Sequence, residues 1–87
     1  MHERSLAEDL VRAAGIAAME EGGPIAAMRV RVGSQSCIDP DALHDQVVWW
    51  SQGTIVEGAR VLVEVVPADF GDPHGADVQL VSVDMAG

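Results

Sequence analysis

The chain has 87 residues, a formal net charge of −9 and one cysteine, and these three properties exclude several protein classes. Phosphate backbones and anionic membranes repel an acidic surface, and only 3% of the residues are aromatic, so we expect no nucleic-acid and no membrane partner. The lone Cys37 excludes an internal disulfide and a cluster of zinc-bound thiolates. The sequence shows no signal-peptide pattern and no apolar run long enough for a bilayer, so we expect a cytoplasmic protein.

The first segment predicts an amphipathic helix from about Ser5 to Glu21. Ser5 and Glu8 have the spacing of a capping box, in which both side chains accept hydrogen bonds from backbone groups of the first turn. Gly22 and the residues after it, Gly-Pro, end the helix, because glycine accepts the left-handed cap and proline cannot continue the turn. The apolar residues expected on its buried face recur at three- and four-residue spacing: Leu6, Leu10, Ala13, Ala14 and Ala17.

A strand and a second helix are predicted next. Residues 26–32 alternate apolar side chains with Arg29 and Arg31, which is typical of a strand with one solvent-exposed face. Asp39 has the chemistry of a helix N-cap, and the proline after it suits the first helical position. Gly53 ends this helix. Three residues share its buried side: Leu43, Val47 and Trp50.

Two further strands complete the predicted fold. Alternating valines at positions 61, 63 and 65 indicate one strand, and Val78, Leu80 and Val83 indicate the last. The residues between them, 70–76, have the composition of a turn. The order helix, strand, helix, strand, strand predicts an α+β fold in which two helices pack on one face of a three-stranded mixed sheet. Residues 1–87 are expected to form a single domain, because so short a chain supplies one core.

The amino terminus, Met1-His2-Glu3, is the candidate metal site. A methionine followed by histidine is expected to be retained, so the α-amine of Met1 and the His2 imidazole lie within chelating reach of each other. With a backbone amide or the Glu3 carboxylate they complete a planar nitrogen and oxygen set, which suits Ni(II) or Cu(II) better than zinc. The reference pKa values of an α-amine and an imidazole are about 7.7–8.0 and about 6.5, so protons compete with the metal. The alternative is a solvated helix terminus with Glu3 placed favourably on the helix dipole.

No catalytic constellation is recognisable, so we expect no enzyme. His44 and His74 lack metal-ligand spacing and are expected at the surface, and Cys37 has no histidine marked as its base. Trp49 and Trp50 are adjacent and cannot share one helix face, so one anchors the core while the other is partly exposed. The exposed one either marks a partner surface or covers the rim of the core.

Four motifs stand out along the chain: Met1-His2-Glu3 with Ser5-Leu6, Val30-Arg31-Val32-Gly33, Asp39-Pro40-Asp41-Ala42-Leu43 and Gly53-Thr54-Ile55-Val56-Glu57-Gly58-Ala59. Together they resemble the HypA/HybF family of hydrogenase nickel-insertion accessory proteins, in which they occur in the same order and at similar spacing. The resemblance covers the chain from Met1 to about residue 67, and residues 80–85 are similar to the family's closing strand.

The resemblance implies a nickel metallochaperone for [NiFe]-hydrogenase, and also for urease, in which Met1, His2 and Glu3 hold Ni(II) as cargo. It implies a maturation GTPase and the hydrogenase large subunit as partners. Family members insert a zinc-binding subdomain with paired C-x-x-C motifs between the last two strands, whereas here that interval is reduced to a turn near residues 70–76. We therefore expect no structural zinc. A metal-independent interaction module that retains the fold is the alternative function, and a marginal core makes a homodimer a further expectation.

Overall fold

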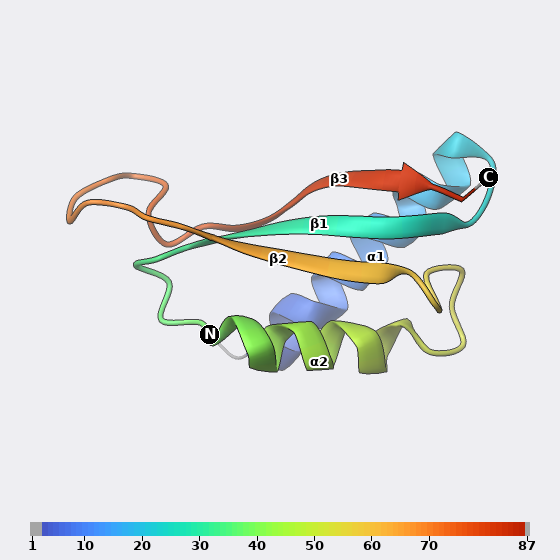
Figure 1. Ribbon diagram of the computed structural model, residues 1–87, viewed down its shortest axis with the longest axis horizontal. Coiled ribbons are helices and arrows are strands. Elements are labelled where there is room, and N and C mark those ends of the chain that lie inside the picture. The colour runs from blue at the N-terminus through green and yellow to red at the C-terminus, as the bar shows by residue number, and fades with distance from the viewer. Residues whose placement is uncertain (1–2, 87) are drawn as a thin grey trace.

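The computed structural model describes residues 3–86 and contains the expected elements in the expected order. These elements are α1 (Glu3–Glu21), β1 (Ile25–Gly33), α2 (Pro40–Ser51), β2 (Arg60–Val66) and β3 (Val78–Met85). The sheet order is β2-β1-β3, with β2 parallel and β3 antiparallel to β1, which makes the sheet mixed. Figure 1 shows α1 crossing behind the sheet while α2 runs alongside β2. The predicted α+β fold is therefore confirmed, and neither helix among residues 3–86 has the length and apolarity that a membrane span requires.

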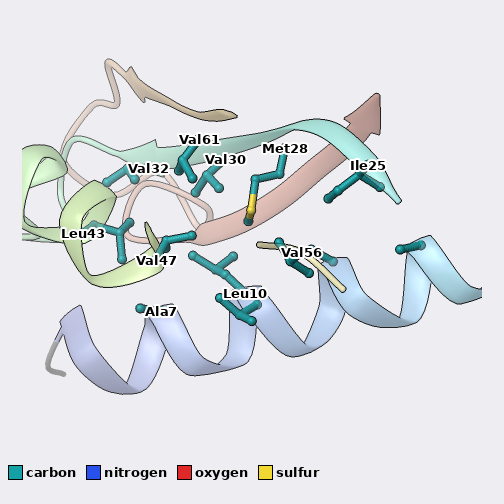
Figure 2. Close-up of a cluster of buried hydrophobic side chains, with 13 residues drawn as sticks. Ala7, Leu10, Ile25, Met28, Val30, Val32, Leu43, Val47, Val56 and Val61 are labelled. Atoms are coloured by element: carbon teal, nitrogen blue, oxygen red, sulfur yellow. The ribbon is translucent and has the colours of Figure 1, made fainter. Parts of the chain in front are cut away.

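The core lies between the two helices and one face of the sheet. Met28 and Val30 of the central strand are almost completely buried, as is Leu43 of α2. Figure 2 shows these side chains converging with Leu10, which rises from α1. The alternation of β1 sends its apolar residues into this cluster and its arginines to the opposite face, as the sequence predicts.

The buried face of α1 differs from the predicted stripe by about one position. Its core residues are Ala7, Leu10, Val11, Ala14 and Ala18. The prediction is wrong for Ala13, which is exposed, and Ala17 is only half-buried. A contact face that includes Val11 and Ala18 turns Ala13 towards solvent, because successive helical residues are about 100° apart.

The two helices begin differently. In α2, the Asp39 Oδ1 accepts hydrogen bonds from the backbone N–H groups of Asp41, at 3.0 Å, and Ala42, at 3.5 Å, so the predicted N-cap is confirmed. In α1, the helix already includes Glu3, so Ser5 lies inside the first turn and cannot be the N-cap. The predicted capping box is therefore wrong, because helical backbone already includes Glu3, three residues before the Leu6 at which this motif would start the helix.

A β-bulge explains the irregular apolar spacing of β3. Val30 pairs with Leu80, whereas its neighbour Arg29 pairs with Ser82, so Val81 is the extra residue of the bulge. One extra residue reverses which side chains face the core beyond that point. Val83 can therefore pack against the core on the same face as Leu80, although the two are an odd number of residues apart.

The segment between α2 and β2 contributes a core residue that the apolar periodicity did not identify. Val56 is buried although residues 52–59 form only turns. Thr54 Oγ1 donates a hydrogen bond to the Ser51 carbonyl at 2.6 Å and accepts one from the Val56 N–H at 3.1 Å. The Gly53 N–H donates to the Glu57 carboxylate at 2.8 Å. These side-chain bonds fold the turns back over the core and place Val56 inside it.

The connection between β2 and β3, residues 67–77, starts and ends beside two adjacent residues at the end of β1, Gly33 and Ser34. The Ser34 N–H donates to the Val66 carbonyl at 2.9 Å, and the Gly33 N–H donates to the Asp77 carbonyl at 2.8 Å. We call these four residues the neck. Because two backbone hydrogen bonds close it, the neck joins both ends of the connection to the end of β1.

Gly33→Ala is expected to destabilise the protein by about 1–3 kcal/mol. A Cβ at this position would lie 2.1 Å from the Gly75 carbonyl oxygen, which accepts a hydrogen bond from the Gln35 N–H, so backbone must move. Urea unfolding followed by circular dichroism measures the effect. Gly23→Ala is the matched control, since a Cβ there meets nothing within 4 Å. Equal midpoints for the two variants would contradict this close approach.

Candidate metal centre

The candidate ligands precede or open α1. Met1 and His2 lie outside the residues that the structure describes, and for Glu3 the structure describes only its place as the first residue of α1. The assignment of these three residues as nickel ligands therefore stays a prediction. Arg4 is the first residue after these three whose side chain the structure describes.

Two aromatic residues of α2 lie beside the first turn of α1. The Arg4 guanidinium carbon is 5.4 Å from the centroid of the Trp50 ring, a distance that allows a cation–π interaction. The Trp49 and Trp50 rings meet edge to face, with centroids 5.1 Å apart and an interplanar angle of 82°. Gln46 completes a surface pocket of about 330 Å³ with these three residues. We call it the tryptophan pocket.

The two tryptophans have different roles, as the sequence predicts. Trp50 is half-buried and packs against the core, whereas the side chain of Trp49 is 60% exposed. The Nε1 atom of Trp50 is buried, and no hydrogen-bond partner for it is found among the described residues. The contact between Arg4 and Trp50 was not predicted, because the two residues are distant in sequence and no local pattern links them.

The other histidines form two-residue pairs with carboxylates. His44 Nδ1 lies 3.1 Å from Asp45 Oδ1, and His74 Nδ1 lies 2.9 Å from Asp77 Oδ2. Within the part of the chain that the structure describes, no three histidine, cysteine or carboxylate groups gather as a metal site. Each described histidine therefore has one carboxylate partner and no third potential metal ligand beside it among the described residues.

Cys37 is exposed and has an unusual backbone. Its φ angle is 60°, in the left-handed region that non-glycine residues rarely adopt, and it precedes the N-cap of α2 by two residues. Its sulfur lies 4.0 Å from the carbonyl oxygen of Gln35. No hydrogen bond joins this thiol to a histidine among the described residues.

A larger groove, of about 420 Å³, lies between the first turn of α2 and β2. Arg29 and Arg31 of β1 line it together with Asp41, His44 and Glu64. Arg29 is already paired, since its guanidinium lies 3.0 Å from the Asp84 carboxylate. The polar side chains that line the groove carry charges of both signs. No residue of α1 lines the groove, so the candidate metal centre stays at the amino terminus.

Comparison with known proteins identifies the family. Residues 1–71 match the family described as "Hydrogenase/urease nickel incorporation, metallochaperone, hypA". The chain is 38% identical over 81 residues to the hydrogenase maturation factor HypA of Deinococcus radiodurans, which covers 92% of this chain and 68% of that protein. The HypA proteins of Methanothermobacter thermautotrophicus and Chloroflexus aurantiacus are each 37% identical, over 80% and 77% of this chain.

This chain spans 58% and 60% of the lengths of those last two relatives. The matched family region includes the amino-terminal segment, both helices and the first two strands. The chain therefore belongs to the HypA family of nickel-incorporation metallochaperones.

Proposed function

We propose that this protein carries Ni(II) for the maturation of [NiFe]-hydrogenase, with the ion held by Met1, His2 and Glu3. The observation that carries the proposal is the family match, which begins at residue 1 and so includes these three residues. The donor chemistry supports it, because an α-amine, an imidazole and a backbone amide are nitrogen ligands that suit planar Ni(II).

The arrangement suits a carrier rather than a catalyst. A planar four-ligand site leaves both faces of the ion open to an incoming ligand, so a receiving protein can replace the donors one at a time. Arg4, which directly follows the three proposed ligands, packs against Trp50 of α2. A planar site with few protein ligands would favour release of the cargo.

The finer assignments belong to the same proposal. We propose the maturation GTPase and the hydrogenase large subunit as partners, urease as a second client, a cytoplasmic location and no catalytic activity. Residues 1–87 would act as one nickel-binding domain without structural zinc. The exposed face of Trp49 offers apolar surface for a partner or for a second copy of the chain.

Calorimetric titration of untagged protein with Ni(II), Cu(II) and Zn(II) tests the proposal. We expect one Ni(II) per chain, tighter binding of Cu(II) and weaker binding of Zn(II), because this order follows the general affinity series and planar geometry disfavours zinc. The absorption spectrum of the nickel-loaded protein should be that of a planar complex. Preference for zinc, or absence of stoichiometric nickel binding, would contradict the carrier function.

A further inference from the structure

The two outer strands of the sheet, β2 and β3, have edges of different character (Figure 1). The β3 edge is interrupted by the bulge at Val81 and carries polar residues such as Ser82 and Asp84. Bulges, prolines and charged side chains are the features that prevent edge-to-edge pairing of sheets. β2 pairs with β1 in an unbroken register and is mostly valine and leucine. The β2 edge therefore has neither a bulge nor a proline to keep another strand from pairing with it.

The outer side of β2 is accessible. Apart from the ladder with β1, no hydrogen bond to residues 61–65 is found within residues 3–86. The groove of about 420 Å³ is lined by four consecutive residues of this strand, Val61 to Glu64. Since consecutive strand residues point to opposite faces, a groove lined by all four follows the edge of the strand. A further strand could therefore reach the backbone of β2 from this side.

The sequence of β2 is complementary to itself when two copies of the strand run antiparallel. Arg60, Leu62 and Glu64 share the face of the sheet that points away from the helices, since the alternating residue Val61 is buried in the core. A twofold axis at Leu62 places the Arg60 of each copy directly opposite the Glu64 of the other. Opposite charges at directly opposed positions of antiparallel strands are favourable. Among the described residues neither Arg60 nor Glu64 forms an ion pair, so both can pair across the axis.

The charge of the molecule restricts how two copies can meet. A chain with a net charge of −9 repels a second copy, so association needs a contact at which opposite charges meet. With the axis moved by one residue, to Val63, Arg60 faces Val66 and Glu64 also faces an apolar residue. The axis at Leu62 instead forms two Arg–Glu pairs in each dimer. Charge complementarity thus favours this one register.

We propose that the β2 edge binds a second copy of this chain, antiparallel about Leu62, and joins the two sheets into one continuous sheet. Asp41 of α2 lines the same groove as Glu64, so the Arg60 of the incoming copy approaches a second carboxylate. Oligomerisation is one of the ways in which a chain of this length gains stability. The contact uses residues 60–64 and no nickel ligand, so it goes beyond the proposed function and can fail while the carrier function stands.

Sedimentation velocity of metal-free protein tests the pairing. We expect a dimer with twice the 9.2 kDa mass of one chain. Glu64→Arg places like charges opposite each other in both pairs, so it should weaken dimerisation at least about tenfold. The same substitution reduces the net negative charge, and general repulsion alone would predict stronger association. The double variant with Arg60→Glu and Glu64→Arg restores opposite charges and should restore the dimer.

A matched control separates the β2 edge from the rest of the surface. Glu20→Arg makes the same change of charge on an exposed residue of α1 and should not weaken the dimer. Urea unfolding followed by circular dichroism confirms that each charge variant folds.

Leu62→Cys in a Cys37→Ser background tests the register. Residues opposite each other in antiparallel strands have Cβ atoms about 4.5–5.5 Å apart, close to the separation of about 3.5–4.5 Å in a disulfide. Oxidised glutathione should therefore convert most of this variant into a disulfide-linked dimer. Ser82→Cys in the same background is the control on the exposed edge of β3 and should stay mostly unlinked.

Three results would overturn the pairing. The first is a protein that stays monomeric at millimolar concentration. The second is a dimer that Glu64→Arg leaves at full strength, such as one formed through the exposed Trp49. The third is preferential crosslinking of Ser82→Cys, which would place the contact at the β3 edge. None of these results bears on nickel binding, which the metal titration tests separately.

Discussion

His2→Ala is expected to weaken Ni(II) binding at least about 100-fold and to remove the one-to-one stoichiometry from a calorimetric titration. The physical reason is that the imidazole and the Met1 amine close the chelate together, and loss of one donor leaves an amine that water and protons displace easily. Changes in the outer shell of a metal site already cost 10–100-fold in affinity, so removal of a ligand should cost more. The spectrum of the planar complex should disappear with the binding.

Two control proteins show whether the loss of nickel binding is specific to the proposed ligands. His44→Ala removes a histidine that is half-exposed on α2 and paired with Asp45, so it should bind nickel like the parent protein. Acetylation of the Met1 amine removes one of the proposed nitrogen donors and should weaken binding as strongly as His2→Ala does. If the acetylated protein retained full affinity, the amine would not be a ligand and the site assignment would have to be abandoned.

Leu43→Ala is expected to destabilise the fold by about 2–5 kcal/mol. Leu43 is completely buried on α2 and belongs to the core cluster that joins this helix to α1 and the sheet (Figure 2). The total stability expected for a chain of this length is roughly 4–13 kcal/mol, so this loss is a large fraction of it. The variant should be partly unfolded near room temperature if the parent lies at the lower end of that range.

Val48→Ala on the same helix provides the control. Its side chain is 41% exposed, so its truncation removes less buried surface and should cost below about 1 kcal/mol. Urea denaturation with circular dichroism gives both free energies of unfolding. A similar loss for Val48 and Leu43 would mean that α2 does not use the predicted face to contact the core.

Regular periodicity predicted most of the fold, and deviations from it account for the errors. The alternation in β1 and the Asp39 N-cap were predicted correctly because each depends on neighbouring residues alone. The exposure of Ala13 depends on which side of α1 meets the sheet, and that is set by tertiary packing. The burial of Val56 depends on hydrogen bonds of Thr54 within a turn, which periodicity does not detect.

The surroundings of the candidate site could not be predicted in the same way. The chemistry of Met1 and His2 is readable from residue type, and the motif order led to the family that the comparisons identify. The stacking of Arg4 on Trp50 brings together two helices that are separated by a strand, so only the assembled fold reveals it. The assignment of the donors thus stays a prediction from the sequence, whereas the contact between Arg4 and Trp50 comes from the structure.

The neck has a consequence for how new segments can be accommodated in this fold. Its two hydrogen bonds hold Val66 and Asp77 against consecutive residues, so a polypeptide that leaves at one returns at the other without crossing the core. Each doubling of the length of a flexible loop costs only about 0.6 kcal/mol in closure entropy. Evolution or protein engineering can therefore insert an independently folding module between Val66 and Asp77 while the hydrophobic core keeps its geometry.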